Sequence, residues 1–269
     1  MKTSNPLSST IYGKNNSSIS GYSPSSYNSY EQYGMPPAKT LTKSSIVNAT
    51  LFTMMVVIFF AVVTVYAGFV NPGLASLMSG AGCFGIIIMG FVIAFTSAKR
   101  GSFIATMLFA AAEGLMVGGF SFFIGNRPID GEPGWVIVSQ AIIATIGLFF
   151  ASLALYGFGI VKVTKKFTSF LVMAMAGFAM LYLINFIITL IFGNNLLLSS
   201  GPLPIIIAAA AIVLGCMSLI QDFHSFDVVT QNASGVEPRF KWAMAVAFMT
   251  SLVWLYTEVL RLLYLLKRD

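Results

Sequence analysis

Apolar and polar residues alternate along the chain in long blocks. After a polar N-terminal stretch, seven runs of mostly apolar residues are separated by short connections rich in Gly, Asn, Pro, Lys and Arg. An α-helix of about 20 apolar residues crosses the ~30 Å hydrocarbon core of a bilayer and satisfies its own backbone hydrogen bonds there. The pattern therefore predicts an all-α polytopic membrane protein with seven transmembrane helices. Their expected bounds are residues 46–69, 74–96, 103–124, 135–160, 168–192, 202–225 and 242–266.

The first 45 residues differ in composition from the rest. They are dominated by Ser, Asn, Tyr, Gly and Pro, and they contain too few apolar residues to offset the entropy lost on ordering. We therefore expect residues 1–45 to form a disordered cytoplasmic tail and residues 46–269 to form the seven-helix transmembrane domain. The tail is either a solvated extension or a recognition segment for a protease or another partner.

Composition excludes several classes of protein. Of the 269 residues, 57% are hydrophobic and 9% are charged, whereas soluble domains carry about 25% charged residues. A soluble enzyme and a charged, disordered protein are excluded on this ground. Two cysteines are too few for a disulfide scaffold, and Cys83 and Cys216 both fall inside predicted helices, where we expect them to be packing residues. With one histidine and no nucleophile–base or metal-ligand cluster, we expect no enzyme activity, no cofactor and no stable metal site.

The basic residues lie unequally on the two sides of the predicted membrane. Arg261 is set aside because it lies inside the last helix; of the others, eleven lie on the side of the N-terminal tail and three on the opposite side. Positive residues are enriched in cytoplasmic segments, so the N-terminus is predicted in the cytoplasm and, after seven spans, the C-terminus outside. The net charge of +6 thus reflects topology, and the lipid bilayer rather than nucleic acid is the expected partner.

Small residues in two of the predicted helices indicate close helix packing. Where lipid supplies no hydrophobic drive for helix association, small residues let two backbones approach each other. Gly114 and Gly118 have the GxxxG spacing in the third run, and the second run contains Gly80, Gly82, Gly85 and Gly90. Ordinary bundle packing is the simplest interpretation of this pattern.

Three acidic residues fall at membrane depth: Glu113 in the third run, Asp222 late in the sixth and Glu258 in the seventh. A carboxylate at the bilayer centre costs about 2.5 to 3.5 kcal/mol on insertion scales, so such acids are functional candidates. Each could also be a protonated or paired structural group, and Glu113 is a candidate for either a pore-lining or a structural role. Arg261 lies three residues after Glu258 and could neutralise it as an ion-pair partner, but we favour the alternative that Arg261 extends to the outer interface.

Asp222 and Glu258 could meet across the last two helices. Two carboxyl groups in contact at low dielectric cannot both stay ionised, so they would share a proton and form a pH-dependent latch. In the ionised state, the same oxygens could make transient contacts with Ca²⁺. The pairing requires residues 239–247 to lie at or beyond the cytoplasmic interface, since Glu258 otherwise lies too far towards the outer side.

Three blocks of sequence, in this order, resemble the Bax inhibitor-1 family of seven-helix membrane proteins, which includes bacterial YccA-like members. They are AEGLMVG with Ser121 in the third run (112–118), QDF in the sixth (221–223) and LVWLYTEVLRLL in the last (252–263). The resemblance implies that the last helix is enclosed by the other six, and that Asp222 and Glu258 form the acid pair of a pH-sensitive Ca²⁺ leak in a bacterial cytoplasmic membrane. The chain departs from the family at three points. The second acid is usually Asp in the family, the linker from Asp227 to Lys241 is longer than in the compact bacterial members, and no arginine lies inside residues 74–96.

Two functions follow from these features. The first is a pH-sensitive calcium leak channel, gated by the carboxyl pair, with Ca²⁺ and H⁺ as permeant or modulating ions. The alternative is a regulator or inhibitor of a membrane quality-control protease that acts through the N-terminal tail. A retinal-type seven-helix receptor is disfavoured because residues 242–266 contain no lysine.

Overall fold

The helical unit of the protein covers Thr40–Asp269. A computed structural model describes residues 41–95, 101–129, 131–193, 195–199, 201–231 and 236–268. Residues 1–40 of the predicted disordered tail lie outside the described residues. The first helix begins at Lys43, three residues before the predicted start of the transmembrane domain, because Thr42 caps it there.

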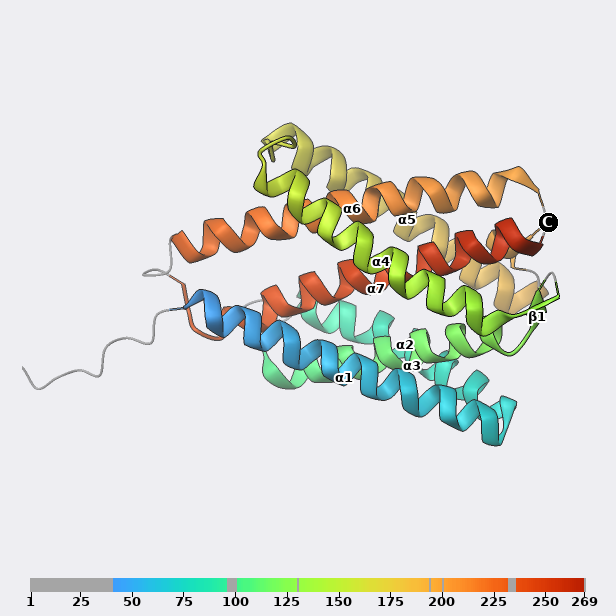
Figure 1. The fold of residues 1–269 in the computed structure, drawn as a ribbon. Helices are drawn as coiled ribbons and strands as arrows, with labels where there is room; N and C mark the ends of the chain where they lie inside the picture. Colours follow the sequence, from blue (N-terminus) through green and yellow to red (C-terminus); the bar gives the residue numbers. More distant parts are fainter. Residues whose placement is uncertain are drawn as a thin grey trace, which may run out of the picture. The chain divides into compact units, whose positions relative to one another are not determined.

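Seven long helices make up most of the described residues of this unit (Figure 1). All seven are long and apolar enough to cross a membrane, which confirms the predicted all-α polytopic fold. They are α1 (Lys43–Val70), α2 (Pro72–Phe95), α3 (Phe103–Gly125), α4 (Gly134–Gly157), α5 (Lys165–Phe192), α6 (Pro202–Gln231) and α7 (Phe240–Arg268). The connections add two paired two-residue strands and one 3-10 helix: β1 (Pro128–Ile129), β2 (Glu132–Pro133) and η3 (Leu196–Leu198).

Polar residues in the connections set the helix ends. Thr42, Ser102 and Thr164 precede α1, α3 and α5, and the side chain of each accepts a hydrogen bond from the backbone N–H three residues later. This bond satisfies one of the donors that the first turn of a helix leaves free. Successive helices run back and forth across the bundle, so we name its two ends by residue. Helix α1 begins at the Lys43 end, and α7 finishes at the Arg268 end (Figure 1).

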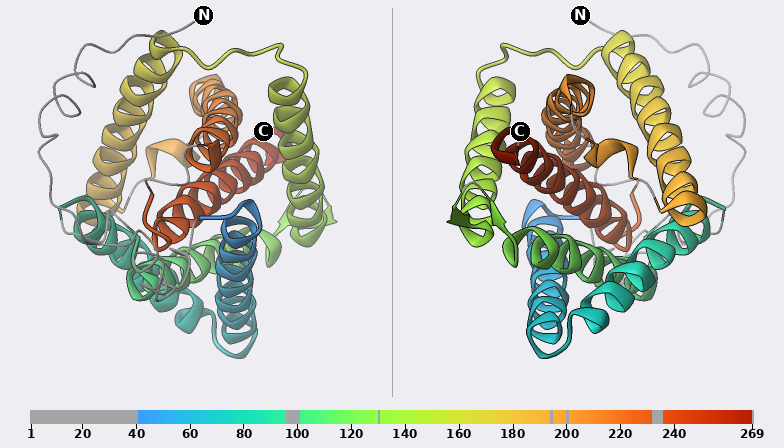
Figure 2. Two further views of the ribbon diagram at one scale, coloured as in Figure 1. Left: turned by 90° about the vertical axis from the view of Figure 1, so that its left-hand side faces the viewer. Right: turned by 90° about the vertical axis from the view of Figure 1, so that its right-hand side faces the viewer.

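Helix α7 runs through the middle of the bundle (Figure 2). It packs closely on α1, α3, α4 and α6. Side chains of α5 also reach it, since Tyr182 contacts Glu258 and Phe178 contacts Trp254. A cavity lies between α7 and the outer helices α2 and α5. The expected enclosure of the last helix therefore consists of four close neighbours on one side, and of side-chain contacts and a cavity on the other.

The apolar core lies where α7 meets its neighbours, while the outer faces of the helices carry exposed apolar side chains. Leu219, Leu255 and Leu260 are completely buried in the cluster that joins α4, α6 and α7. By contrast, Phe95 is 81% exposed and Ile143 is 70% exposed. An extended apolar exterior of this kind is typical of helices that face lipid.

Glycines on α3 allow α1 to approach it closely. A Cβ atom on Gly114 would lie 2.5 Å from a backbone oxygen of α1, and one on Gly118 would lie 2.8 Å from a Cα atom of α1. These distances leave no room for a side chain, which confirms the close packing predicted from the GxxxG spacing. On α2, a Cβ atom on Gly82 would likewise meet the backbone of α3, whereas Gly80 and Gly90 have nothing within 4 Å.

Gly118→Leu is expected to destabilise the folded protein by about 1–3 kcal/mol or more, because the new side chain must push α1 away from α3. The matched control is Gly80→Leu, in which the side chain enters open space and the helix gains the higher propensity of Leu. Thermal unfolding in detergent, followed by circular dichroism, measures the difference. Equal losses of stability in the two variants would show that the close contact between α1 and α3 at Gly118 does not contribute to the stability of the protein.

Candidate functional site

The three predicted acids and Arg261 are all buried inside the bundle. The exposed fraction is 3% for Glu113, 8% for Asp222, 5% for Glu258 and 4% for Arg261. A charged group buried at membrane depth needs a partner or a change in protonation. The partners of each group therefore decide what it can do.

Glu258 pairs with Arg261 on the same helix. A guanidinium nitrogen of Arg261 lies 2.5 Å from Oε2 of Glu258, and the hydroxyl of Tyr182 on α5 donates to Oε1 of Glu258 at 2.5 Å. The guanidinium carbon also lies 5.3 Å from the centre of the Tyr182 ring, which is within range of a cation–π interaction. These three side chains join α5 to α7, and we call them the α7 charge cluster.

The prediction that Arg261 extends to the outer interface is wrong. Arg268, seven residues farther along α7, reaches the end of the bundle instead, where it donates to the carbonyl oxygen of Leu198 in η3. Arg261 stays buried because Glu258 supplies the opposite charge one turn away, although two of its guanidinium nitrogens form no hydrogen bond with a described residue. Tyr182 was not predicted as a partner, and its one indication in the sequence is a hydroxyl within a long apolar run.

Asp222 has a separate set of partners. Its carboxylate accepts a hydrogen bond of 2.6 Å from the hydroxyl of Ser251 on α7, and the Ser251 hydroxyl also lies 2.8 Å from that of Ser218 on α6. Ser251 comes seven residues before Glu258, so Asp222 meets α7 roughly 10 Å from the level of Glu258 along the helix axis. The predicted proton-sharing pair of Asp222 and Glu258 is therefore wrong.

The lengths of the last two helices explain this separation. Glu258 lies 18 residues after Phe240, the first residue of α7, which corresponds to a rise of about 27 Å. Asp222 lies nine residues before Gln231, the last residue of α6, which corresponds to about 14 Å. The rise of about 27 Å along α7 places Glu258 towards the Arg268 end of the bundle. The rise of about 14 Å along α6 places Asp222 level with the middle of α7.

Glu113 on α3 is held by the residue next to Ser251. The hydroxyl of Thr250 donates to Oε1 of Glu113 at 3.0 Å, and Oε2 has no hydrogen-bond partner among the described residues. Two consecutive hydroxyl residues of α7 thus bind two acids from different helices, Glu113 from α3 and Asp222 from α6. Sequence reasoning missed both hydroxyls, although two adjacent polar residues in the middle of an apolar run were a usable indication.

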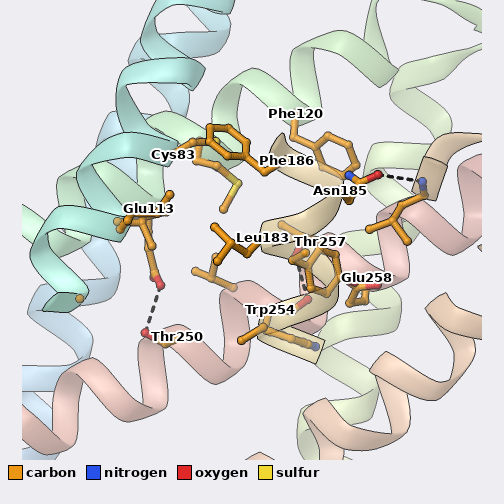
Figure 3. Close-up of a pocket in the computed structure, with 18 of the residues that line it drawn as sticks. Cys83, Glu113, Phe120, Leu183, Asn185, Phe186, Thr250, Trp254, Thr257 and Glu258 are labelled. Carbon is orange, nitrogen blue, oxygen red and sulfur yellow. Dashed lines mark hydrogen bonds between the residues drawn. The ribbon is translucent and has the colours of Figure 1, made fainter. Parts of the chain in front are cut away.

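A cavity of about 820 Å³ lies between α2, α3, α5 and α7, and we call it the α2–α5 cavity. Its charged lining residues are Glu113, Glu258 and Arg261. Asn185 adds a polar side chain, and most of the remaining wall is apolar (Figure 3). Asp222 does not belong to the lining.

The α2–α5 cavity extends between the two ends of the bundle. Phe95, the last residue of α2, lines it at the Lys43 end. Asn195 and Leu197, in the connection from α5 to α6, line it at the Arg268 end. Glu113 lies between these ends, ten residues after the first residue of α3. The structure therefore places three of the four predicted site residues around one space that runs along the bundle.

A second cavity, of about 600 Å³, lies between α1, α3, α4 and α7. The described residues that line it include no charged side chain. The hydroxyls of Ser121 and Tyr256, which lie 2.8 Å apart, are among its few polar groups. Because the charged residues gather in the α2–α5 cavity, that cavity is the candidate functional site.

Comparison with known proteins bears on the family of this chain. A model of the family described as Bax inhibitor 1 like matches residues 10–268. The chain belongs to the Bax inhibitor 1 like family. The resemblance seen in the sequence is thus confirmed, and the seven apolar helices make this family member a multi-pass integral membrane protein. No curated protein and no solved structure matches the chain.

In this Bax inhibitor 1 like protein, the three blocks that carried the resemblance converge on α7. The third-helix block brings Glu113 to Thr250, and the sixth-helix block brings Asp222 to Ser251. The last block contains Glu258 and its partner Arg261. Glu113 and Asp222 therefore contact α7 at one level, at Thr250 and Ser251, whereas Glu258 lies about two turns farther along the same helix. The three acids do not form a single carboxyl pair.

Proposed function

We propose that this protein is a pH-sensitive calcium leak channel and that the α2–α5 cavity is its ion path. The observation that supports this most directly is that two buried acids, Glu113 and Glu258, line one cavity that extends between the ends of the bundle. A carboxylate at membrane depth lowers the electrostatic cost of a cation there, because opposite charges attract more strongly at low dielectric than in water. The calcium leak implied by the family resemblance has the same requirement.

Oxygen atoms line the cavity at the level of Glu113 and from there towards the Arg268 end. Thr250 and Thr257 supply hydroxyl groups, and Asn185 and Asn195 supply amide oxygens. Ca²⁺ prefers oxygen ligands. In the part of the chain that the structure describes, no three His, Cys, Asp or Glu side chains come together. This arrangement suits brief contacts during passage rather than a stable metal site.

The pH response is assigned to the α7 charge cluster in place of the Asp222–Glu258 pair. When Glu258 is ionised, it cancels the charge of Arg261 beside the path. When acid protonates Glu258, the positive charge of Arg261 is left unmatched and repels an approaching Ca²⁺. Tyr182 is the other titratable group in contact with Glu258, and Glu113 is the remaining charge on the cavity wall. The proposal therefore predicts that acid lowers the leak.

The proposal also includes an orientation. The N-terminal tail and the connections at the Lys43 end carry most of the basic residues outside the helices, so this end faces the cytoplasm of a bacterial cell and the Arg268 end faces outside. The alternative function, regulation of a membrane protease through residues 1–45, depends mainly on a segment outside the described residues. No observation on the described part of the chain favours it.

Glu113→Gln is expected to lower Ca²⁺ flux into proteoliposomes by about tenfold or more, because it removes a charge attraction of at least about 1.4 kcal/mol from the path. The matched control is Glu132→Gln, an exposed acid in β2 that does not line the cavity and is expected to leave the flux unchanged. A Ca²⁺-sensitive dye trapped in the liposomes measures the flux. Flux no higher than in protein-free liposomes, or equal flux for the wild type and Glu113→Gln, would contradict the proposal.

A further inference from the structure

We propose that the α2–α5 cavity binds a lipophilic organic cation, that is, a single positive charge on an apolar body, and that Glu113 is its counter-ion. This binding goes beyond the calcium leak, because it does not depend on ion conduction. If the cavity is also the ion path proposed above, a bound cation blocks that path. Only this consequence rests on the proposed function.

The charges that line the cavity do not balance. Arg261 lies against Glu258, so these two residues are neutral as a pair. Glu113 forms no ion pair with a described residue, and its Oε2 accepts no hydrogen bond from one. Its side chain is nevertheless only 3% exposed. A buried carboxylate without a partner is strongly unfavourable, and a bound cation would offset that cost.

The cavity has the size and the walls that an apolar ligand requires. Its volume of about 820 Å³ falls within the ~300–1,000 Å³ that is typical of small-molecule sites. Figure 3 shows the rings of Phe120, Phe186 and Trp254 in the region between the two labelled glutamates. The face of an aromatic ring attracts a cation, most strongly where water is excluded. The walls therefore favour both parts of the proposed ligand.

A ligand can reach this site from the bilayer. Phe91 on α2 is 62% exposed and Leu183 on α5 is 44% exposed, although both line the cavity. The cavity wall is therefore continuous with the lipid-facing surface of these two helices. An apolar cation that has partitioned into the membrane can enter from the side without crossing water.

A lipophilic monocation suits the site better than a tightly held metal ion. Ca²⁺ takes about six to eight oxygen ligands, so a single unpaired carboxylate on a largely apolar wall gives it few contacts. One positive charge on an apolar body needs one counter-ion and apolar surface, and the cavity supplies both. A neutral lipophile has no comparable reason to prefer this cavity to the uncharged second cavity between α1, α3, α4 and α7.

Equilibrium dialysis of the full chain in detergent against tetraphenylphosphonium tests the proposal. We expect saturable binding of tetraphenylphosphonium, and in a separate dialysis we expect no saturable binding of tetraphenylborate, which has nearly the same shape and the opposite charge. Glu113→Gln is expected to weaken the binding by about tenfold or more. Asp222→Asn is the matched control, because it removes a buried carboxyl that does not line the cavity and is expected to bind as the wild type does.

A second variant keeps the test decisive if Glu113→Gln does not fold. Leu183→Trp fills the cavity from its lipid-facing rim while Glu113 is intact, and it is also expected to abolish binding. Equal binding of the two probes, unchanged binding in these two variants, or the absence of saturable binding would overturn the proposal. If the wild-type protein binds tetraphenylphosphonium saturably but shows no Ca²⁺ flux, the calcium leak is contradicted and the cation site is supported. If it shows Ca²⁺ flux but no such binding, the cation site is contradicted and the calcium leak is supported.

Discussion

Glu258→Gln is expected to destabilise the folded protein by about 3–5 kcal/mol, although it replaces only one oxygen atom with a nitrogen. The reason is that Arg261 is 4% exposed and Glu258 is the one acid in ion-pair contact with it among the described residues. Without that charge, the guanidinium is left buried and unmatched. Arg261→Met is expected to have a similar effect, because it leaves the carboxylate of Glu258 without its cation.

The double variant Glu258→Gln/Arg261→Met is expected to recover most of the lost stability, since it leaves no unmatched charge and a replaced buried pair is often nearly neutral in stability. Reversible unfolding in mixed detergent micelles gives the free energies of the four proteins. The control is Glu237→Gln, which breaks the exposed ion pair of Glu237 and Arg239, and no measurable change is expected there. Purely additive losses in the double variant would contradict the pairing of Glu258 with Arg261.

The double variant Glu258→Gln/Arg261→Met is also expected to lose the part of the acid inhibition that comes from Arg261, so that only the protonation of Glu113 still lowers the Ca²⁺ flux. In the wild type, we expect the flux to fall by about tenfold or more between neutral and acidic pH, because protonation of Glu258 exposes the path to the charge of Arg261. The double variant has neither the titrating group nor the charge that it controls. Flux into proteoliposomes, measured over a pH series with the internal buffer held constant, gives the response.

Asp222→Asn distinguishes this mechanism from one based on a shared proton. Asp222 meets α7 at Ser251, so its substitution is expected to leave the acid inhibition in place. Groups that share no partner usually act independently, so the effects of Asp222→Asn and Glu258→Gln on stability should add to within about 0.5 kcal/mol. Loss of the pH response in Asp222→Asn alone, or a response in the double variant as large as in the wild type, would contradict the assignment to the α7 charge cluster.

The helix bounds follow closely from local sequence, and the largest difference, at the end of the sixth helix, has a tertiary cause. The third run was predicted to cover residues 103–124, and α3 covers Phe103–Gly125. The sixth helix extends to Gln231, six residues beyond its predicted end. In this extension, Asp227 accepts a hydrogen bond of 2.7 Å from Tyr156 on α4 and lies 3.9 Å from Lys43 on α1. These contacts hold a polar segment in the helix, although its hydropathy alone predicts the end of a span.

By itself, the sequence determined the seven spans, the burial of the three acids, the close contact at the α3 glycines and the family. All of these depend on properties of short segments, namely hydropathy, side-chain size and residue order. Only the tertiary structure decided which group each acid meets. A partner across two helices depends on the rotation and axial offset of both, and these are set by the packing of all seven helices together. For this reason Glu258 is paired within its own helix, Asp222 is bonded to Ser251, and one carboxyl oxygen of Glu113, beside the cavity, accepts no hydrogen bond from a described residue.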